Sequence, residues 1–253
     1  GVVLPGTASI DGGAGVDVLT ETDGVNTIAI TAAGLTGTYN SATLTSVETL
    51  NGGTGVDTYN LQFVDTALTI NANSGDDVFN LSSDAPTNTG TTNNITAALT
   101  LNGDANNDTI NLSDVGDATN NTGAITDTTI TGLGLTGGIT YGTIEDVNIN
   151  LGSGDDNFTV TSTNAGTTVD LDTGAGDDTI NIGNGGNSLD GILSAVSVGG
   201  GANTATGDTL NINDQGDAEA NNYTVTGTTI TRTSPSAPLT STITYGTGMT
   251  IEN

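Results

Sequence analysis

The sequence predicts an all-β fold, a parallel β-solenoid of stacked coils of 20 to 30 residues each. A short turn rich in glycine and ending on aspartate recurs seven times. Apolar residues alternate with polar ones before and after most of these turns, which is the two-residue period of a strand with one buried face. No apolar pattern of period 3.6 persists for three helical turns, so helices are not expected.

Each turn is expected to join two strands. The seven copies start at Gly12, Gly52, Asn73, Gly103, Gly152, Thr173 and Gly201, and their terminal aspartates are Asp17, Asp57, Asp77, Asp108, Asp156, Asp178 and Asp208. The strands after the turns carry apolar second and fourth residues, Tyr59 and Leu61 being one such pair, whereas the first copy keeps only Leu19. Glycine allows the positive φ angles and the close backbone approach that such a corner needs.

The spacing of the terminal aspartates predicts a larger repeat. The steps are 40, 20, 31, 48, 22 and 30 residues, so a series of one long, one short and one medium step occurs twice, and each series spans about 100 residues. A second motif, without aspartate, occurs around Tyr39 and Tyr141, inside the two long steps, and again around Tyr245, after Asp208. We expect it to form an extra coil. The chain then reads as one continuous segment of about two and a half units, approximately 1–97, 98–195 and 196–253, in a protein that we expect to continue beyond Asn253.

Two structural alternatives stay open at this point. Tandem β-sandwich modules of about 100 residues would also be all-β, although they give no reason to repeat the turn three times per module. Asparagine separates the two apolar residues of five strands, at Asn60, Asn80, Asn111, Asn181 and Asn211. These amides form either a hydrogen-bonded ladder or simply a solvated face, and we expect the second.

Composition limits the partners. The net charge is −28, from 29 acidic residues against the single base Arg232. Nucleic acid binding depends on lysine and arginine and is therefore excluded, and no apolar stretch is long enough for a membrane-spanning helix. Because histidine and cysteine are absent, the side-chain ligands available for a metal are oxygens, which suit Ca²⁺.

The terminal aspartates are the candidate metal ligands. Stacked at strand spacing, two carboxylates about 5 Å apart repel by roughly 1 kcal/mol even in water, which a divalent ion would relieve. The main candidates are Asp57, Asp77, Asp108, Asp156, Asp178 and Asp208. Asp17 is a weaker candidate because it has no aspartate neighbour one coil away. Further candidates are the preceding acids Asp76, Asp155 and Asp177 and the turn glycines Gly55, Gly75, Gly154 and Gly176. The competing explanation is that glycine and aspartate are simply common turn residues that need no metal.

The turns with their aspartates resemble the calcium-binding nonapeptide of RTX (hemolysin-type) secreted proteins. That resemblance implies calcium ions between successive turns, held by the terminal aspartate and main-chain oxygens of two layers. It would make Asp57, Asp77 and Asp108 one ladder and Asp156, Asp178 and Asp208 another. The copies cover about a quarter of the chain, and they are separated by 20 to 48 residues, whereas RTX motifs follow one another without interruption.

These patterns predict a calcium-stabilised, extracellular structural protein of the bacterial surface, a segment of an adhesin, surface layer or filament that self-associates head to tail. The alternative is a calcium-dependent folding, secretion or carbohydrate-binding module attached to a secreted enzyme, with cell-surface polysaccharide as its partner. Catalysis by this chain is not expected, because histidine and lysine are absent. Glu48 and Glu145 are the carboxylates outside the turns that a catalytic role would need, and both are expected to be ordinary surface residues.

Overall fold

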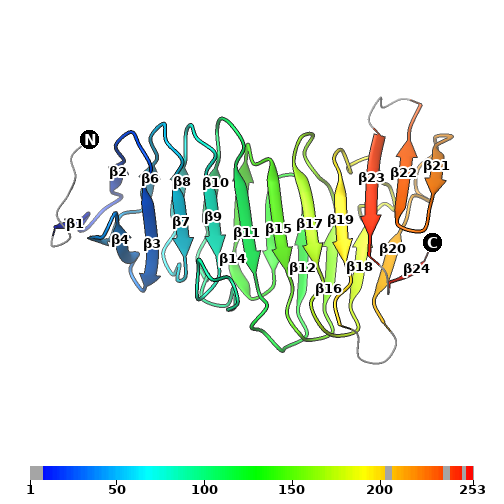
Figure 1. Cartoon of the computed structure of the whole chain (residues 1–253), viewed down its shortest axis with the longest axis horizontal. Helices are drawn as coiled ribbons and strands as arrows, with labels where there is room; N and C mark the ends of the chain where they lie inside the picture. The colour runs from blue at the N-terminus through cyan, green and yellow to red at the C-terminus, as the bar shows by residue number, and fades with distance from the viewer. Residues whose placement is uncertain (1–7, 203–206, 236–239, 247–248, 253) are drawn as a thin grey trace. The chain divides into compact units, whose positions relative to one another are not determined.

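The computed structural model describes residues 8–202, 207–235, 240–246 and 249–252. In these residues the regular structure consists of 24 strands and no helix, as predicted (Figure 1). The strands belong to two sheets in which most neighbours run parallel. Parallel pairing differs from the antiparallel pairing of immunoglobulin-like modules.

The chain divides into two compact units. Unit 1 comprises Gly1–Asp114 and Thr131–Asp146, and unit 2 comprises Val115–Ile130 and Val147–Asn253. The division into three repeat units ending near residues 97, 195 and 253 stays a prediction from the sequence.

Unit 1 contains strands of both sheets, in the orders β1-β5-β4-β3-β7-β9-β11 and β2-β6-β8-β10-β14. The strands of the first are β1 Ser9–Asp11, β3 Thr27–Ala32, β4 Thr36–Tyr39, β5 Ala42–Thr45, β7 Thr58–Leu61, β9 Val78–Leu81 and β11 Thr109–Ser113. Those of the second are β2 Val18–Thr20, β6 Thr49–Asn51, β8 Leu68–Asn71, β10 Leu99–Asn102 and β14 Leu135–Gly142. Glycine–aspartate turns lead from β6 to β7, from β8 to β9 and from β10 to β11.

Unit 2 has the corresponding orders β15-β17-β19-β23-β22-β21 and β12-β16-β18-β20-β24. The first set comprises β15 Asp146–Asn150, β17 Thr168–Asp172, β19 Val196–Gly199, β21 Asn222–Val225, β22 Thr229–Thr233 and β23 Thr240–Tyr245. The second comprises β12 Thr122–Ile125, β16 Asn157–Val160, β18 Thr179–Ile182, β20 Thr209–Ile212 and β24 Thr250–Glu252. The remaining strand, β13 Thr129–Gly132, has residues in both units, and the first residue of β15, Asp146, belongs to unit 1.

A narrow apolar core follows from the two-residue alternation. In unit 1, β7 and β9 pair in register, so that Tyr59 lies beside Phe79 and Leu61 beside Leu81, all of them fully buried. The two aromatic rings stack with centroids 5.1 Å apart. Stacking identical strand positions in this way builds a continuous core from few large residues, which suits a chain with 3% aromatics.

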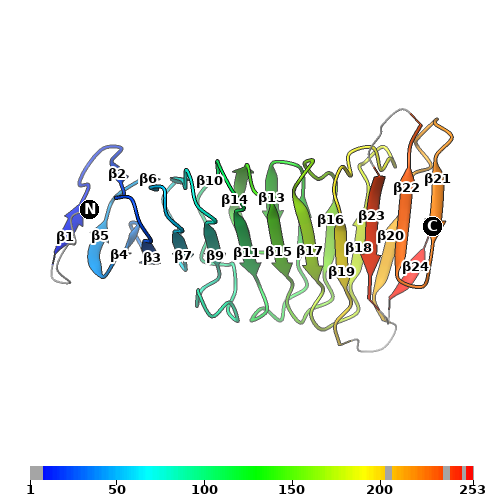
Figure 2. The ribbon, with the colours of Figure 1, turned by 45° about the horizontal axis from the view of Figure 1, so that its top comes forward.

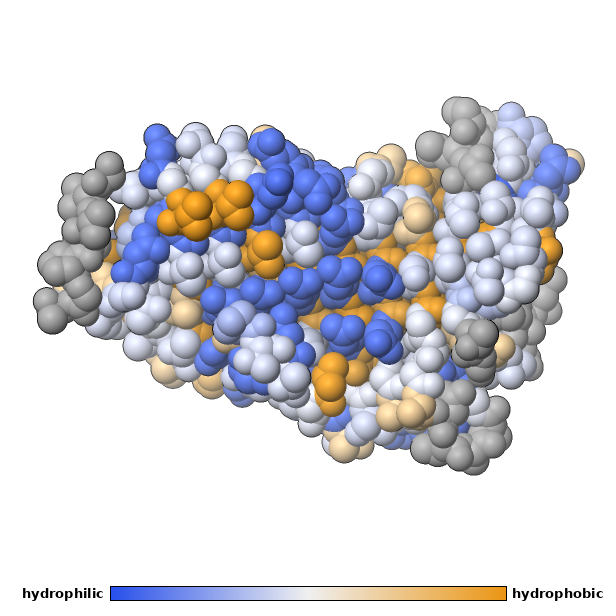
Figure 3. All heavy atoms as spheres, viewed as in Figure 1, coloured by the Kyte–Doolittle hydropathy of each residue, from blue (hydrophilic) through white to orange (hydrophobic). Residues whose placement is uncertain are grey.

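The asparagines form hydrogen-bonded ladders, and the expectation of a merely solvated face was wrong. In unit 1 the Asn80 Nδ2 donates to Asn60 Oδ1 at 3.0 Å, and the Asn111 Nδ2 donates to Asn80 Oδ1 at 3.0 Å. In unit 2, Asn211 donates to Asn181 at 3.0 Å. Figure 3 shows a hydrophilic row crossing β7, β9 and β11. In-register parallel strands place equal residues side by side, and an amide both donates and accepts, so the row bonds to itself.

The tyrosine motif also differs from its expected form. In unit 1 the long step is not a plain extra coil, since β3, β4 and β5 form an antiparallel meander. In unit 2, β21, β22 and β23 do the same (Figure 2). The β4–β5 connection is a two-residue turn in which Asn40 and Ser41 both have positive φ, as a tight hairpin requires. The sequence there reads Asn-Ser rather than the common Asn-Gly, which is why the hairpin was not predicted.

Candidate functional site

The terminal aspartates lie at the turns, directly before the strands β7, β9, β11, β16, β18 and β20, and their side chains are buried. None of them is more than 2% exposed; they are Asp57, Asp77, Asp108, Asp156, Asp178 and Asp208. We call the set in each unit an inner aspartate column. Burying a carboxylate is costly unless hydrogen bonds compensate it, so the partners of these groups show what the columns do.

In unit 1 each inner carboxylate accepts a hydrogen bond from the backbone of the preceding turn. The Asn26 N–H donates to Asp57 Oδ1 at 2.8 Å, the Asp57 N–H to Asp77 Oδ1 at 2.6 Å, and the Asp77 N–H to Asp108 Oδ1 at 2.8 Å. The column ends at Glu145, whose carboxylate accepts the Asp108 N–H at 2.9 Å. The side chain of each turn therefore holds the backbone of the turn before it.

Unit 2 repeats this arrangement. The Asn121 N–H donates to Asp156 Oδ1 at 2.7 Å, the Asp156 N–H to Asp178 Oδ1 at 2.7 Å, and the Asp178 N–H to Asp208 Oδ1 at 3.0 Å. The structure thus joins the residues that the sequence grouped into two ladders. Part of the last copy, residues 203–206, lies outside the described residues.

The sequence analysis did not identify the first member of either column or the last member of the column in unit 1. Asn26 and Asn121 begin them, and nothing in the glycine–aspartate pattern marks either residue. Glu145 ends the column of unit 1, and Glu48 makes the same kind of bond outside the columns, because it accepts the Asp17 N–H at 2.9 Å just as Glu145 accepts that of Asp108. Both glutamates had been expected to be ordinary surface residues. The two glutamates are about 100 residues apart, which is the length of the repeat unit, and this spacing could have indicated that they share one role.

The turn glycines are required by contact between successive turns. A Cβ on Gly75 would lie 2.3 Å from the carbonyl oxygen of Gly55, and one on Gly176 would lie 2.3 Å from that of Gly154. Gly75 and Gly176 also have φ angles of +141° and +136°. The repeated glycine two residues before the aspartate is thus explained by packing and backbone conformation alone.

Replacing Gly176 with alanine is expected to lower the free energy of unfolding by about 2–4 kcal/mol, through strain at positive φ and displacement of a neighbouring turn. Gly185→Ala is the matched control in the same unit, because a Cβ there meets no atom within 4 Å. Chemical denaturation of both variants measures the difference. Equal stabilities of the two variants would contradict the proposed contact between turns.

The preceding acids form a second, outer row at the turns. Asp76 Oδ1 accepts the Asn107 N–H at 3.1 Å in unit 1, and Asp155 Oδ1 accepts the Asp177 N–H at 3.0 Å in unit 2. Asp76 and Asp155 are exposed and Asp177 is half-buried. Their carboxylates therefore combine a bond between turns with access to solvent.

The electrostatic state of the inner columns reflects their burial. Burial raises the pKa of Asp77 to about 6, of Asp108 to about 7 and of Asp178 to about 6, although the backbone N–H that each accepts lowers it. Neighbouring carboxylates of the same column raise these pKa values further. The Oδ2 atoms of all three residues are buried and have no hydrogen-bond partner among the described residues. The pKa of Glu21 rises to about 8, again chiefly through burial.

The protein is expected to become more stable on mild acidification. An acid with a raised pKa in the folded state binds its proton more tightly there, so its stabilising effect is full below pH 4 and is lost as the pH rises to about 7. Between pH 8 and pH 5 the gain should be on the order of a few kcal/mol. Denaturation midpoints across this range measure it, and Asp108→Asn should reduce the slope. A midpoint that falls on acidification would contradict the assignment.

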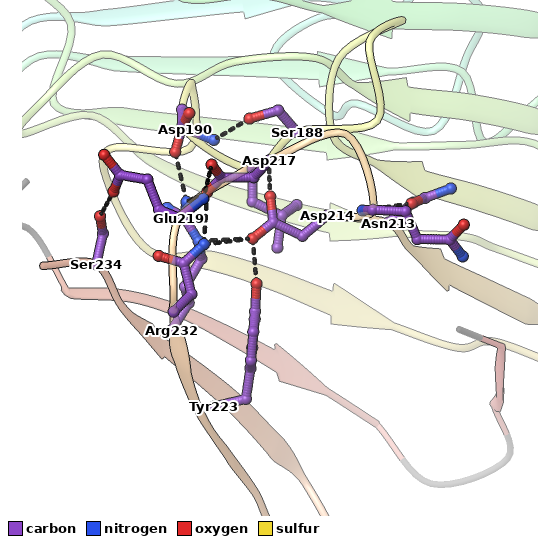
Figure 4. Close-up of polar contacts among 12 residues, drawn as sticks. Ser188, Asp190, Asn213, Asp214, Asp217, Glu219, Tyr223, Arg232 and Ser234 are labelled. Atoms are coloured by element: carbon purple, nitrogen blue, oxygen red, sulfur yellow. Dashed lines mark hydrogen bonds and ion pairs between the residues drawn. The ribbon is translucent and has the colours of Figure 1, made fainter. Parts of the chain in front are cut away.

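Arg232, the single base of the chain, is buried in an acidic cluster of unit 2 (Figure 4). Its Nε lies 2.9 Å from Asp214 Oδ2 and its Nη2 lies 2.7 Å from Asp217 Oδ2, with Asp190 as a third partner. Tyr223 of β21 donates its hydroxyl to Asp214, and the Asn221 side chain donates to Asp214 and Asp217. The cluster therefore fixes the start of β21.

The inner columns offer hydrogen-bond donors to their carboxylates rather than a ring of oxygens. Besides the N–H groups at Oδ1, the Gly53 N–H approaches Asp57 Oδ2 at 3.4 Å and the Gly152 N–H approaches Asp156 Oδ2 at 3.3 Å. Among the described residues, no three acidic side chains gather as a metal-binding group. This environment suits an anion held by amides. Ca²⁺ binding by the inner aspartates stays a prediction.

No helix in the described part of the chain is long and apolar enough to cross a membrane. No protein-family model and no curated protein matches the chain.

Proposed function

We propose that this chain is a segment of an extracellular structural protein, a β-solenoid of stacked 20- to 30-residue coils whose role is mechanical. One observation carries the proposal: the repeated polar residues are used to join one turn to the next. The inner aspartates, the asparagine ladders and the outer acids all bond across neighbouring turns. Such a module transmits load through many equivalent contacts.

The mostly parallel sheets support the solenoid, with antiparallel meanders as regular insertions. The resemblance to RTX proteins is part of the same proposal, supported by the alignment of the terminal aspartates of successive copies. A bacterial-surface location is consistent with an acidic, cysteine-free chain.

Calcium stabilisation is a second part of the proposal, and the outer row is the better place for it. Asp155 and Asp177 lie on consecutive turns of unit 2, joined by a hydrogen bond to Asp155 Oδ1. Their exposure leaves carboxylate oxygens within reach of a hydrated cation, which the inner residues do not offer. A bound ion would add RT ln(1+[L]/Kd) to stability and would reduce repulsion in a chain of charge −28.

Thermal unfolding in millimolar calcium and in chelator tests this assignment. We expect calcium to raise the melting temperature of the parent and of Asp178→Asn by several degrees, but not that of the Asp155→Asn, Asp177→Asn double variant. Magnesium at equal concentration controls for screening. Identical melting temperatures with calcium and chelator would remove calcium from the proposal. Single-molecule pulling tests the mechanical role separately, since unfolding without a resolvable force peak would contradict it.

A further inference from the structure

The strand β21 has an edge with no strand beyond it in the described part of the chain. It is the last strand in its sheet order, and Figure 1 shows it beyond β22. All four of its residues are exposed, including Tyr223 at 45% and Val225 at 65%. Exposed alternate apolar residues on an unpaired strand edge are a docking surface for another strand.

The corresponding strand of the same unit shows what covers such an edge. The strand β12 pairs in parallel with β16, the strand that follows the turn ending on Asp156. There the Asn121 N–H donates to Asp156 Oδ1 at 2.7 Å, the Asn157 N–H to the Asn121 carbonyl at 2.9 Å, and the Thr161 N–H to the Ile125 carbonyl at 2.9 Å. As a result Ile125 is fully buried.

Unit 1 contains the same contact independently. The meander strand β3 pairs in parallel with β7, which follows the turn ending on Asp57. The Asn26 N–H donates to Asp57 Oδ1 at 2.8 Å, the Thr58 N–H to the Asn26 carbonyl at 2.9 Å, and the Gln62 N–H to the Ile30 carbonyl at 2.8 Å. In both cases an asparagine precedes the strand, and an apolar residue four positions later is buried.

Asn221 and Val225 occupy these two positions before and within β21. Residues 221–225 follow 121–125 at an interval of 100, and the sequence around them repeats Asp114, Asp117 and Asn121 as Asp214, Asp217 and Asn221. The Arg232 cluster holds Asn221 and Tyr223 in place. The side-chain Oδ1 of Asn221 is buried, and no described residue donates a hydrogen bond to it. The residues that β21 would contribute to such a contact are therefore present.

We propose that β21 receives, in parallel, a glycine–aspartate turn and the strand after it from another repeat unit of this kind. The aspartate would accept the Asn221 N–H, and the first and fifth residues after it would donate to the carbonyls of Asn221 and Val225. The apolar second and fourth residues of the incoming strand would cover Tyr223 and Val225. This deepens the proposed structural role, on which it rests, by assigning the surface through which repeats are added.

A peptide from the chain itself tests the proposal. The segment from Gly152 to Ser162 contains the turn, Asp156 and β16, and the control peptide carries Asp156→Ala. Both are added to the intact 253-residue chain at up to millimolar concentration, with amide hydrogen exchange and NMR titration as readouts. We expect saturable binding that slows exchange in β21, and at least ten-fold weaker binding of the control peptide.

Two receptor variants locate the binding site. Val225→Lys should weaken peptide binding at least ten-fold, whereas Val115→Lys, at another exposed valine of unit 2, should leave it unchanged. Absence of binding at millimolar peptide, equal binding of the two peptides, or protection of a segment other than β21 would overturn the proposal. None of these outcomes affects the calcium and pulling experiments, so a failure here is distinguishable from a failure of the proposed function.

Discussion

Asp77→Ala is expected to lower the free energy of unfolding by about 2–4 kcal/mol, whereas Asp77→Asn is expected to stay within about 1 kcal/mol of the parent at pH 8. The Asp57 N–H bonds to Asp77 Oδ1 at 2.6 Å, and both residues are fully buried. Alanine leaves that N–H without an acceptor, which costs the desolvation of a buried donor, and leaves a cavity. Asparagine keeps an acceptor oxygen and removes the buried charge.

Denaturant unfolding of the two variants at pH 8 and pH 5 measures this difference. Asp76→Ala is the matched control, because the neighbouring Asp76 is exposed and its loss should cost less than about 1 kcal/mol. The comparison separates two roles for the inner column. If Asp77 served as a calcium ligand, asparagine would be nearly as damaging as alanine in the presence of calcium. Equal losses for both variants would therefore contradict the hydrogen-bonding role.

Arg232→Met is expected to destabilise the meander of unit 2 by about 3–5 kcal/mol, because it leaves buried carboxylates without their counterion. The side chains of Asp214 and Asp217 are 9% and 6% exposed, and each lies within 3 Å of the guanidinium. Because methionine is similar in volume to the aliphatic part of arginine, the loss of stability results mainly from the loss of the positive charge. The effect should be greatest for β21, whose Tyr223 bonds to Asp214.

Amide hydrogen exchange resolved by strand checks this prediction, since protection should fall in β21 and β22 before it falls in β16 and β18. Asp190→Asn is the control: Asp190 is 57% exposed, so removing its charge should have a small effect. Adding Asp214→Asn to Arg232→Met should restore part of the lost protection. If exchange in β21 is unchanged by Arg232→Met, the cluster does not fix this strand.

The local structure around the turns could be predicted from the sequence. An apolar residue at every second position predicts a strand with one buried face, so the two-residue period identifies both the strands and the residues that point into the core. The grouping of Asp57, Asp77 and Asp108, and of Asp156, Asp178 and Asp208, follows from placing equal turns on one another. The tight corners at Gly75 and Gly176 could also be predicted from the sequence, whereas the close approach of a neighbouring turn to these glycines is seen only in the structure.

The partners of those residues were decided only by the tertiary structure. A carboxylate can accept an N–H or bind a cation, and the choice depends on which atoms of a distant turn lie within 3 Å, which no local pattern records. Asn26 and Glu145 belong to the column of unit 1 for the same reason. The meanders were missed because Asn40 and Ser41 adopt the positive φ angles of a tight hairpin without the glycine that usually marks one. What the sequence determined by itself is the repeated strand and corner, through short-range alternation and backbone sterics. What the tertiary structure decided is how each corner holds the next, because those bonds join residues 20 to 37 positions apart.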